Sequence, residues 1–474
     1  MVSLILSFVV LVAAYLVYAR ITEKAFGPDD RQTPATRLAD GVDYVGMKPW
    51  RASLVELLNI AGTGPIFGAL MGACFGPVVF LWIVLGAILA GGVHDYMVGM
   101  ISERHDGQSI AELSGIYLGS AAKWVMRIFS VVLLLLTGTV FVNSPATLLA
   151  RMTPAWMNET FWIVVILIYY VLATLLPIDK VIGKLYPVFG IVLILMALGI
   201  LGGIAFGGYT VPELSFSNLH PEGLPVWPFM FVTVACGAIS GFHATQAPMM
   251  SKCITSEKHG KRVFYGAMLQ ESAIALIWAA AGVAFYGTTG GLNRALSELG
   301  QSGTVYDIST KMLGTVGGIL AVVGVVVCPI TSGDTAFRSA RLILAEITGL
   351  RQKEIRNRLI LTIPLLAISA VLTQLDFNVL WRYFSWSNQT LAMISLWVAT
   401  AYLLRKNRNV LTSLLTAIPA AFMSAVSMTY ILLADEGFRL SESIACPAGI
   451  VFAALCFGIY LCGVRSAKHR TETL

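Results

Sequence analysis

Asn59-Ile60-Ala61-Gly62-Thr63-Gly64-Pro65 stands in the middle of an apolar stretch, residues 52–74, that is long enough to cross a membrane as a helix. Glycine and proline at this depth interrupt a helix and release backbone N–H and C=O groups from their partners. Such groups are tolerated inside a bilayer only where they line a cavity or are buried in protein. The stretch therefore predicts a broken membrane helix that takes part in binding.

The composition of the chain also indicates a membrane protein. Of its 474 residues, 57% are hydrophobic and only 12% are charged, whereas a soluble surface needs about a quarter or more of its residues charged. The net charge of +6 is spread over short loops instead of one basic face, which argues against nucleic acid as a partner. The seven cysteines show no metal-ligand spacing, and we interpret them as packing residues.

Apolar stretches recur along the whole chain and predict an all-α polytopic fold with about thirteen transmembrane helices. The linkers between them are too short for a soluble domain. The predicted spans are residues 2–19, 52–74, 77–101, 124–148, 160–178, 184–206, 226–251, 263–287, 313–335, 357–375, 377–403, 409–434 and 444–464.

Lysine and arginine residues gather in alternate loops, which fixes an expected orientation because basic loops stay in the cytoplasm. They follow the first, third, fifth, seventh, ninth, eleventh and last stretches. We therefore expect the N-terminus outside and the tail, residues 465–474, in the cytoplasm. Residues 1–19 lack a basic start and a small-residue cleavage site, so we expect a retained helix instead of a cleaved signal peptide.

A second interruption is expected between Gly237 and Pro248, where glycine, serine and proline again stand inside a predicted span. Five helices separate the two breaks, so they enter the membrane from opposite faces. This pattern is the sequence signature of an inverted-repeat transporter. The alternative is that these glycines only allow close helix packing.

The predicted helices divide into two five-helix halves, residues 52–206 and 226–403. One extra helix, residues 1–19, precedes them, and two helices, residues 409–464, follow. This is the LeuT-type layout of five plus five inverted helices.

Several motifs resemble the carbon starvation protein A (CstA) family of peptide and pyruvate transporters, in its shorter form. Together they are dispersed over most of the chain, which makes the resemblance specific. The motifs are DGVDYVGMKPW (40–50), LLNIAGTGPIFGALMGACFGP (57–77), GGVHDYMVGMISERHDGQSI (91–110), ACGAISGFHA (235–244), YGAMLQES (265–272), TSGDTAFRSAR (331–341) and WRYFSWSNQTLA (381–392).

The resemblance implies a carrier of the bacterial inner membrane with a LeuT-like fold of the amino acid/polyamine/organocation superfamily. It implies import of peptides or pyruvate when carbon is scarce, by proton symport, without a cofactor. It leaves the choice between these substrates open.

Ionisable residues inside apolar helices are costly and mark ion paths or buried partners. His94 and Asp95, near the end of the predicted helix 77–101, form a candidate proton-transfer pair or a structural helix-end pair. Glu271, about two turns inside its helix, is a candidate proton carrier or gate. Asp334 is a further candidate, but Arg338 four residues later equally predicts a structural ion pair.

The substrate candidates gather at the two interruptions and on the helix 377–403. Opened backbone at the first break offers N–H groups to a carboxylate, and polar side chains add donors and acceptors. For the last two residues below, a hydrogen bond between helices is the ordinary alternative. The candidates are Asn59, Gly62, Thr63, Gly64, Ser240, His243, Gln246, Asn388 and Gln389.

A sodium site is a separate hypothesis on the helix 313–335. In the LeuT-type layout, the adjacent hydroxyls of Thr331 and Ser332, with the carbonyl of Cys328 one turn earlier, resemble a sodium ligand set, and hard cations prefer such oxygens. Hydroxyls in membrane helices also bond their own backbone, which is the structural alternative.

Other classes of function are disfavoured. The chain has no HExxH zinc motif, no GxSxG nucleophile turn and no phosphate-binding loop, so we do not expect an enzyme. A channel or nutrient sensor on a transporter scaffold remains an alternative, although no soluble output domain is expected. The predicted function is a secondary symporter for small carboxylate-bearing nutrients, coupled to protons or, alternatively, to sodium.

Overall fold

The structure is a computed structural model that describes residues 1–41, 44–175, 178–407 and 410–472. Within these ranges the chain is helical and forms no strand; one isolated bridge joins Met47 to Ile254. The helices are α1 (Val2–Leu16), α2 (Tyr18–Phe26), α3 (Pro34–Arg37), α4 (Pro49–Ala61), α5 (Gly64–Ala73), α6 (Val78–Gly86), α7 (Gly92–Arg104), α8 (Ile110–Leu118), α9 (Ser120–Met152), α10 (Glu159–Leu175), α11 (Ile178–Phe206), α12 (Phe231–Thr233), α13 (Gly241–Ser251), α14 (Gly266–Tyr286), α15 (Thr289–Val322), α16 (Cys328–Thr348), α17 (Ile355–Leu372), α18 (Phe377–Asn407), α19 (Val410–Leu433) and α20 (Glu442–Glu472).

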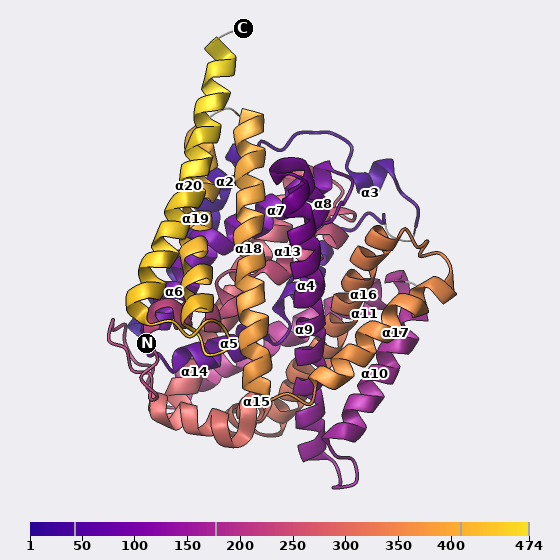
Figure 1. Ribbon diagram of the computed structural model, residues 1–474. Helices are drawn as coiled ribbons and strands as arrows, with labels where there is room; N and C mark the ends of the chain where they lie inside the picture. Colours follow the sequence, from indigo (N-terminus) through magenta and orange to yellow (C-terminus); the bar gives the residue numbers. More distant parts are fainter. Residues whose placement is uncertain (42–43, 176–177, 408–409, 473–474) are drawn as a thin grey trace.

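Long apolar helices run along one common direction and form a bundle (Figure 1). Within the described residues, nine helices are long and apolar enough to cross a membrane, or ten if the bent pair α4 and α5 counts as one span. The all-helical membrane fold is therefore confirmed. The predicted spans 160–178 and 409–434, the motif 40–50 and the tail 465–474 each include residues outside the described ranges.

The first predicted interruption is present between α4 and α5. The two helices are bent by 50°, and Gly62 at the bend has φ 13° and ψ −136°, far from helical values. A Cβ at this position would lie 2.5 Å from the Phe141 ring of α9. Any larger residue at this position would therefore collide with the neighbouring helix unless Phe141 moved.

The second predicted interruption lies between a 3-10 turn, Ala235–Gly237, and the start of α13 at Gly241. Ser240 is extended, with φ −144° and ψ 126°. The break is shorter than the predicted region 237–248, because Pro248 is accommodated inside α13. The two breaks meet, since a Cβ on Gly64 would lie 2.4 Å from the Cys236 sulfur.

One span consists of α6, a π-helical turn (Ala87–Gly91) and α7. It packs against the second break. A Cβ on Gly91 would lie 2.3 Å from the Ala238 carbonyl oxygen, so small residues let this span approach the opened backbone. All of α7 from Gly92 to Glu103 is buried. The centre of the bundle is therefore packed around the two interruptions.

Candidate functional site

A buried carboxylate on α7 links two imidazoles. Asp95 Oδ1 lies 2.7 Å from His94 Nδ1, and its Oδ2 lies 2.8 Å from His243 Nδ1 on α13. All three residues are at most 2% exposed. When Asp95 is ionised, each of the facing ring nitrogens must carry a hydrogen, so the carboxylate sets the tautomers of both histidines.

His94 and Asp95 lie deeper than the sequence predicts. The helix continues to Arg104 instead of ending near residue 101. His94 is therefore ten residues from the end of α7, or about 15 Å along the axis. The prediction that placed this pair near a helix end is corrected accordingly: the pair belongs to the centre of the bundle.

Glu271 of α14 lies on the other side of the His243 ring. Its Oε2 is 3.3 Å from His243 Nε2, but the geometry is not that of a hydrogen bond, and both Glu271 oxygens lack a hydrogen-bond partner. The Cys236 sulfur lies within 4.8 Å of these atoms, and Glu56 of α4 is close enough to interact with them electrostatically. One imidazole is thus surrounded by the carboxylates of three helices.

This arrangement can store and pass a proton. Ionised carboxylates are costly in the apolar interior of a membrane protein, and a histidine between two of them can receive a proton at one ring nitrogen and release it at the other. The side chains of Asp95, His243 and Glu271 are accordingly arranged as a relay across α7, α13 and α14. We call these three residues the relay.

The amides of α18 satisfy backbone groups that the second break releases. Asn388 Oδ1 accepts hydrogen bonds from Ser240 Oγ at 3.1 Å and from the Phe242 N–H at 2.7 Å. Gln389 Nε2 donates to the Ala235 carbonyl at 3.1 Å. In this conformation both predicted substrate residues therefore hold the break open from its two sides.

Several predicted substrate residues carry buried oxygens without a hydrogen-bond partner. They are Asn59 Oδ1 and Thr63 Oγ1 at the first break and Gln246 Oε1 on α13. Each of these residues is at most 1% exposed. Unsatisfied polar atoms in a buried position are costly, and those at the first break stand beside the opened backbone of Gly62 and Gly64.

The predicted sodium residues bond to backbone in this conformation. Thr331 Oγ1 donates to the Cys328 carbonyl at 2.8 Å, and Ser332 Oγ donates to the Leu58 carbonyl on α4 at 3.3 Å. The second contact joins α16 to the helix before the first break. Each hydroxyl thus donates to a backbone carbonyl, as the structural alternative predicts.

Asp334 pairs with Arg338 one turn later, with Nη2 to Oδ2 at 3.3 Å. Both side chains are 7% exposed, and Tyr169 of α10 is near enough to feel both charges. None of the contacts described for Asp334 reaches the relay. Its geometry is that of the structural ion pair.

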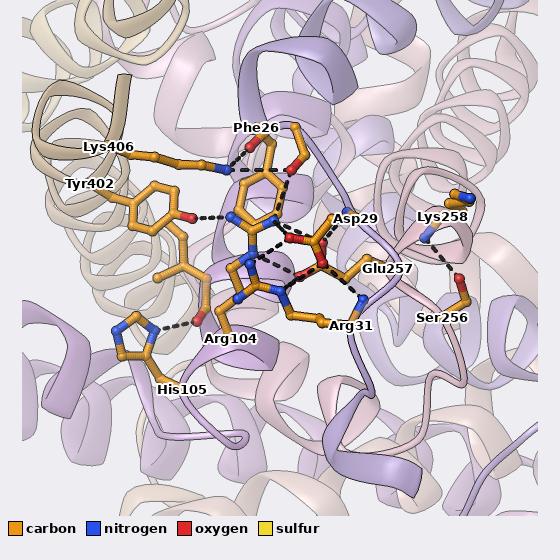
Figure 2. Close-up of polar contacts among 12 residues, drawn as sticks. Phe26, Asp29, Arg31, Arg104, His105, Ser256, Glu257, Lys258, Tyr402 and Lys406 are labelled. Carbon is orange, nitrogen blue, oxygen red and sulfur yellow. Dashed lines mark hydrogen bonds and ion pairs between the residues drawn. The ribbon is translucent and has the colours of Figure 1, made fainter. Parts of the chain in front are cut away.

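A second polar cluster closes one end of the bundle (Figure 2). Arg104, at the end of α7, donates to both oxygens of Glu257, at 2.7 and 2.8 Å, and to the Tyr402 hydroxyl of α18 at 2.8 Å. It also donates to the Gly27 carbonyl after α2. Glu257 is fully buried, so this bidentate pair is shielded from water.

The segment after α2 adds further charges to this cluster. Arg31 bonds Asp29 at 2.6 Å, and these hydrogen bonds hold the pKa of Asp29 well below its usual range. Lys406 of α18 donates to the carbonyl of Phe26 and lies over its ring. The Arg104 cluster, as we call this group, ties α2, α7, α18 and the connection before α14 together.

The sequence identifies all three residues of the relay as candidates, but not the contacts between them. His94, Asp95, His243 and Glu271 are all candidates, yet the sequence assigns His243 to substrate binding and Glu56 to no role. Sequence reasoning misses the Arg104 cluster because its members look like ordinary loop charges. The only signal for it is Arg104 within the motif 91–110.

The chain matches the family model described as carbon starvation protein CstA over residues 1–157, 151–308 and 284–430. An uncharacterized membrane protein of Haemophilus influenzae is 40% identical over 341 residues, which cover 61% of this chain and 92% of that protein. The peptide transporter CstA of Bacillus subtilis is 26% identical over 52% of each chain.

The pyruvate/proton symporter BtsT of Escherichia coli is 28% identical over 340 residues, or 56% of this chain and 47% of that protein. The chain thus matches about half the length of each of these two named transporters. Among solved structures, a mutant manganese transporter of Eremococcus coleocola superposes with a TM-score of 0.53 at 14% identity, covering 89% of this chain and 94% of that one. This likeness shows the fold alone.

Proposed function

Because the chain belongs to the carbon starvation protein CstA family, we propose that it is a secondary transporter that imports small carboxylate-bearing nutrients, peptides or pyruvate, by proton symport. The relay is the observation that carries this proposal. A symporter needs a protonatable group whose state depends on the conformation around the substrate. Asp95, His243 and Glu271 provide one directly beside both helix breaks.

The substrate carboxylate is proposed to bind where the two breaks meet. The start of α5 at Gly64 presents the positive end of a helix, and Thr63 and Asn59 have buried oxygens there without partners. The hydroxyl of Thr63 can donate to a carboxylate. Ser240, just before α13, and Gln246, within α13, belong to the side of the second break.

The finer architecture belongs to the same proposal. We assign thirteen membrane passes, with halves 52–206 and 226–403, an extra helix 1–19 and two further helices 409–464. Support comes from the two breaks, which lie in the second and seventh of the predicted spans and touch each other through Gly64 and Cys236. Two of the predicted spans that are not among the nine long apolar helices correspond to the bent pair α4 and α5 and to the shorter α10.

The Arg104 cluster is proposed to close the cytoplasmic end. The alternation of basic loops places α2, the connection before α14 and the end of α18 on that side. Opening toward the cytoplasm then requires α7 and α18 to separate, which breaks the hydrogen bonds from Arg104 to Glu257 and Tyr402. We also propose a location in the bacterial inner membrane and a role in carbon starvation, which membership of the family supports.

Uptake into proteoliposomes tests the proposal. Labelled dialanine and labelled pyruvate are presented with and without an inward pH gradient, in sodium and in choline buffer. We expect accumulation that requires the pH gradient and is unchanged in choline. Equal uptake with and without the gradient would overturn proton coupling.

Sodium symport is the second candidate, because the adjacent hydroxyls of Thr331 and Ser332 each lie beside a backbone carbonyl, of Cys328 and of Leu58. Loss of uptake in choline, restored by sodium, would identify this mode. Flux that does not saturate with substrate would instead indicate a channel.

A further inference from the structure

A cavity of about 500 Å³ lies at the end of the bundle opposite the Arg104 cluster. Its walls come from α5, the connection 207–225, α15, α18 and the connection from α19 to α20; Figure 1 shows α15 and the α19–α20 connection at one end and α2 and α8 at the other. The volume is within the range of small-molecule sites, roughly 300–1,000 Å³.

The deep part of this cavity offers hydrogen-bond donors. Trp381 and Ser385 of α18 line it, are each 1% exposed, and have no hydrogen-bond partner at Nε1 and Oγ. Arg382 stands between them in sequence; its side chain is 42% exposed and pairs with Glu436 at 3.2 Å. An indole N–H and a guanidinium donate only, and a hydroxyl can also donate, so this wall suits an acceptor such as a carboxylate.

The mouth of the cavity is acidic. Glu222, Asp435 and Glu442 line it and are exposed. Asp435 faces the guanidinium of Arg439 at 3.8 Å, and Glu436, whose side chain is 6% exposed, is already paired with Arg382. His220 does not offset them, because burial lowers its pKa and favours the neutral ring. A mouth with this excess of negative charge attracts cations and repels small anions.

We propose that this cavity is an outer recognition site for a zwitterion, a short peptide with a free ammonium group, in preference to a monoanion such as pyruvate. The ammonium group binds at the acidic mouth, and the carboxylate binds at Trp381, Arg382 and Ser385. This inference rests on the proposed transport function and names its substrate class. Ser385 is one turn, about 4.5 Å along the axis, from Asn388 at the second break, so the cavity leads toward the central site.

The test compares three probes on the purified protein: dialanine, N-acetyl-dialanine and pyruvate. Binding is measured by titration calorimetry in detergent, and uptake is measured in proteoliposomes. We expect dialanine to bind at least about tenfold more tightly than the other two, a difference of about 1.4 kcal/mol. Equal or tighter binding of N-acetyl-dialanine or pyruvate would overturn the inference.

Variants of the acidic residues test whether the ammonium group binds at the mouth of the cavity. In Glu222→Gln combined with Glu442→Gln, we expect the KM for dialanine to rise about threefold to tenfold with kcat unchanged, as for the loss of two exposed charge interactions. Glu298→Gln is the matched control, because Glu298 is exposed on α15 but does not line the cavity. An unchanged KM in the double variant contradicts the acidic mouth as the ammonium site.

The two proposals fail in different ways. If pyruvate accumulates with the pH gradient and dialanine does not, transport stands and the recognition site is wrong. If none of the probes accumulates with the gradient but dialanine alone binds, the recognition site stands and proton symport is wrong. The binding measurement on the unaltered protein does not depend on the folding of any variant.

Discussion

His243 lies between the two carboxylates of the relay, Asp95 and Glu271. Its Nδ1 is fixed by Asp95 at 2.8 Å, and its Nε2 faces Glu271 at 3.3 Å without a completed hydrogen bond. A small movement of α13 relative to α14 would complete or lengthen that second contact. In the proposed mechanism, the protonation of the relay is therefore coupled to the position of α13, the helix that follows the second break.

Removing the exchangeable proton from Glu271 should uncouple transport. We expect Glu271→Gln to lower gradient-driven accumulation at least tenfold while substrate exchange across the membrane continues, because glutamine keeps the shape but cannot titrate. Counterflow and accumulation are measured in the same proteoliposomes. Glu298→Gln, an exposed carboxylate, should change neither; unimpaired accumulation in Glu271→Gln would exclude it as the proton carrier.

Truncating Asp95 should cost stability as well as activity. In Asp95→Ala, the ring nitrogens of His94 and His243 lose their acceptor inside the protein. Breaking such a buried pair costs about 3–5 kcal/mol. We expect a clear fall in the midpoint of thermal unfolding, with a smaller fall for Asp95→Asn, which retains a carbonyl oxygen. Equal midpoints for the unaltered protein and Asp95→Ala would contradict the hydrogen-bond network.

The elements around the breaks depend on close backbone contact. α5 approaches the end of α12 at Gly68, where a Cβ would lie 2.5 Å from the Val234 carbonyl oxygen. α13 approaches α18 in the same way at Gly241, 2.3 Å from the Asn388 carbonyl oxygen. The glycines thus position the opened helix ends, because backbone cannot move aside as a flexible side chain can.

A methyl group at Gly68 should therefore separate the two breaks. We expect Gly68→Ala to lower the free energy of unfolding by about 1–3 kcal/mol through overpacking and to reduce uptake. Gly202→Ala on α11 is the control, since no atom lies within 4 Å of its added Cβ and alanine favours the helix by up to about 1 kcal/mol. The prediction fails if the two variants unfold alike in a thermal-shift assay.

The closed end of the bundle depends on contacts between elements far apart in the chain. Glu257 and Arg104 are 153 residues apart, and Tyr402 lies on a third element. We expect Arg104→Ala to make this end open more readily, because Glu257 then loses its bidentate partner. A cysteine placed at Gln246 should then react faster with a permeant labelling reagent. Arg351→Ala, which changes a basic residue outside the cluster, is the control. Unchanged labelling in Arg104→Ala would contradict a role of the Arg104 cluster in closing this end.

At the scale of the whole molecule, the two polar clusters and the outer cavity lie along one direction. The cavity is at one end, the relay at the centre, and the Arg104 cluster at the other end. In the proposed function, this conformation is closed on the side of the Arg104 cluster.

The orientation of the chain can be tested directly. Ser217, in the connection 207–225 that contributes to the cavity, and Lys353, in the connection between α16 and α17, are both exposed. Each is replaced by cysteine in a background in which Cys446, Cys456 and Cys462 are serine. We expect an impermeant maleimide to label Ser217→Cys in intact cells and Lys353→Cys only in inverted vesicles. The reverse pattern would overturn the expected orientation.

The sequence determines what depends on local composition. Apolar runs of about 20 residues must become membrane helices, since unpaired backbone is not tolerated in lipid. Glycine and proline inside the stretches 52–74 and 226–251 must interrupt two of them. Because charges are rare within such helices, composition alone singles out His94, Asp95 and Glu271 as candidates.

Tertiary structure alone decides which of these groups meet. Asp95 and His243 are 148 residues apart, and no spacing along the chain shows that they share a hydrogen bond. The same holds for Arg104 and Glu257, which look like ordinary loop charges in sequence but form a buried pair in the fold. Periodicity and composition report the environment of each helix, whereas pairing across helices depends on how they pack, and that packing is a property of the whole chain.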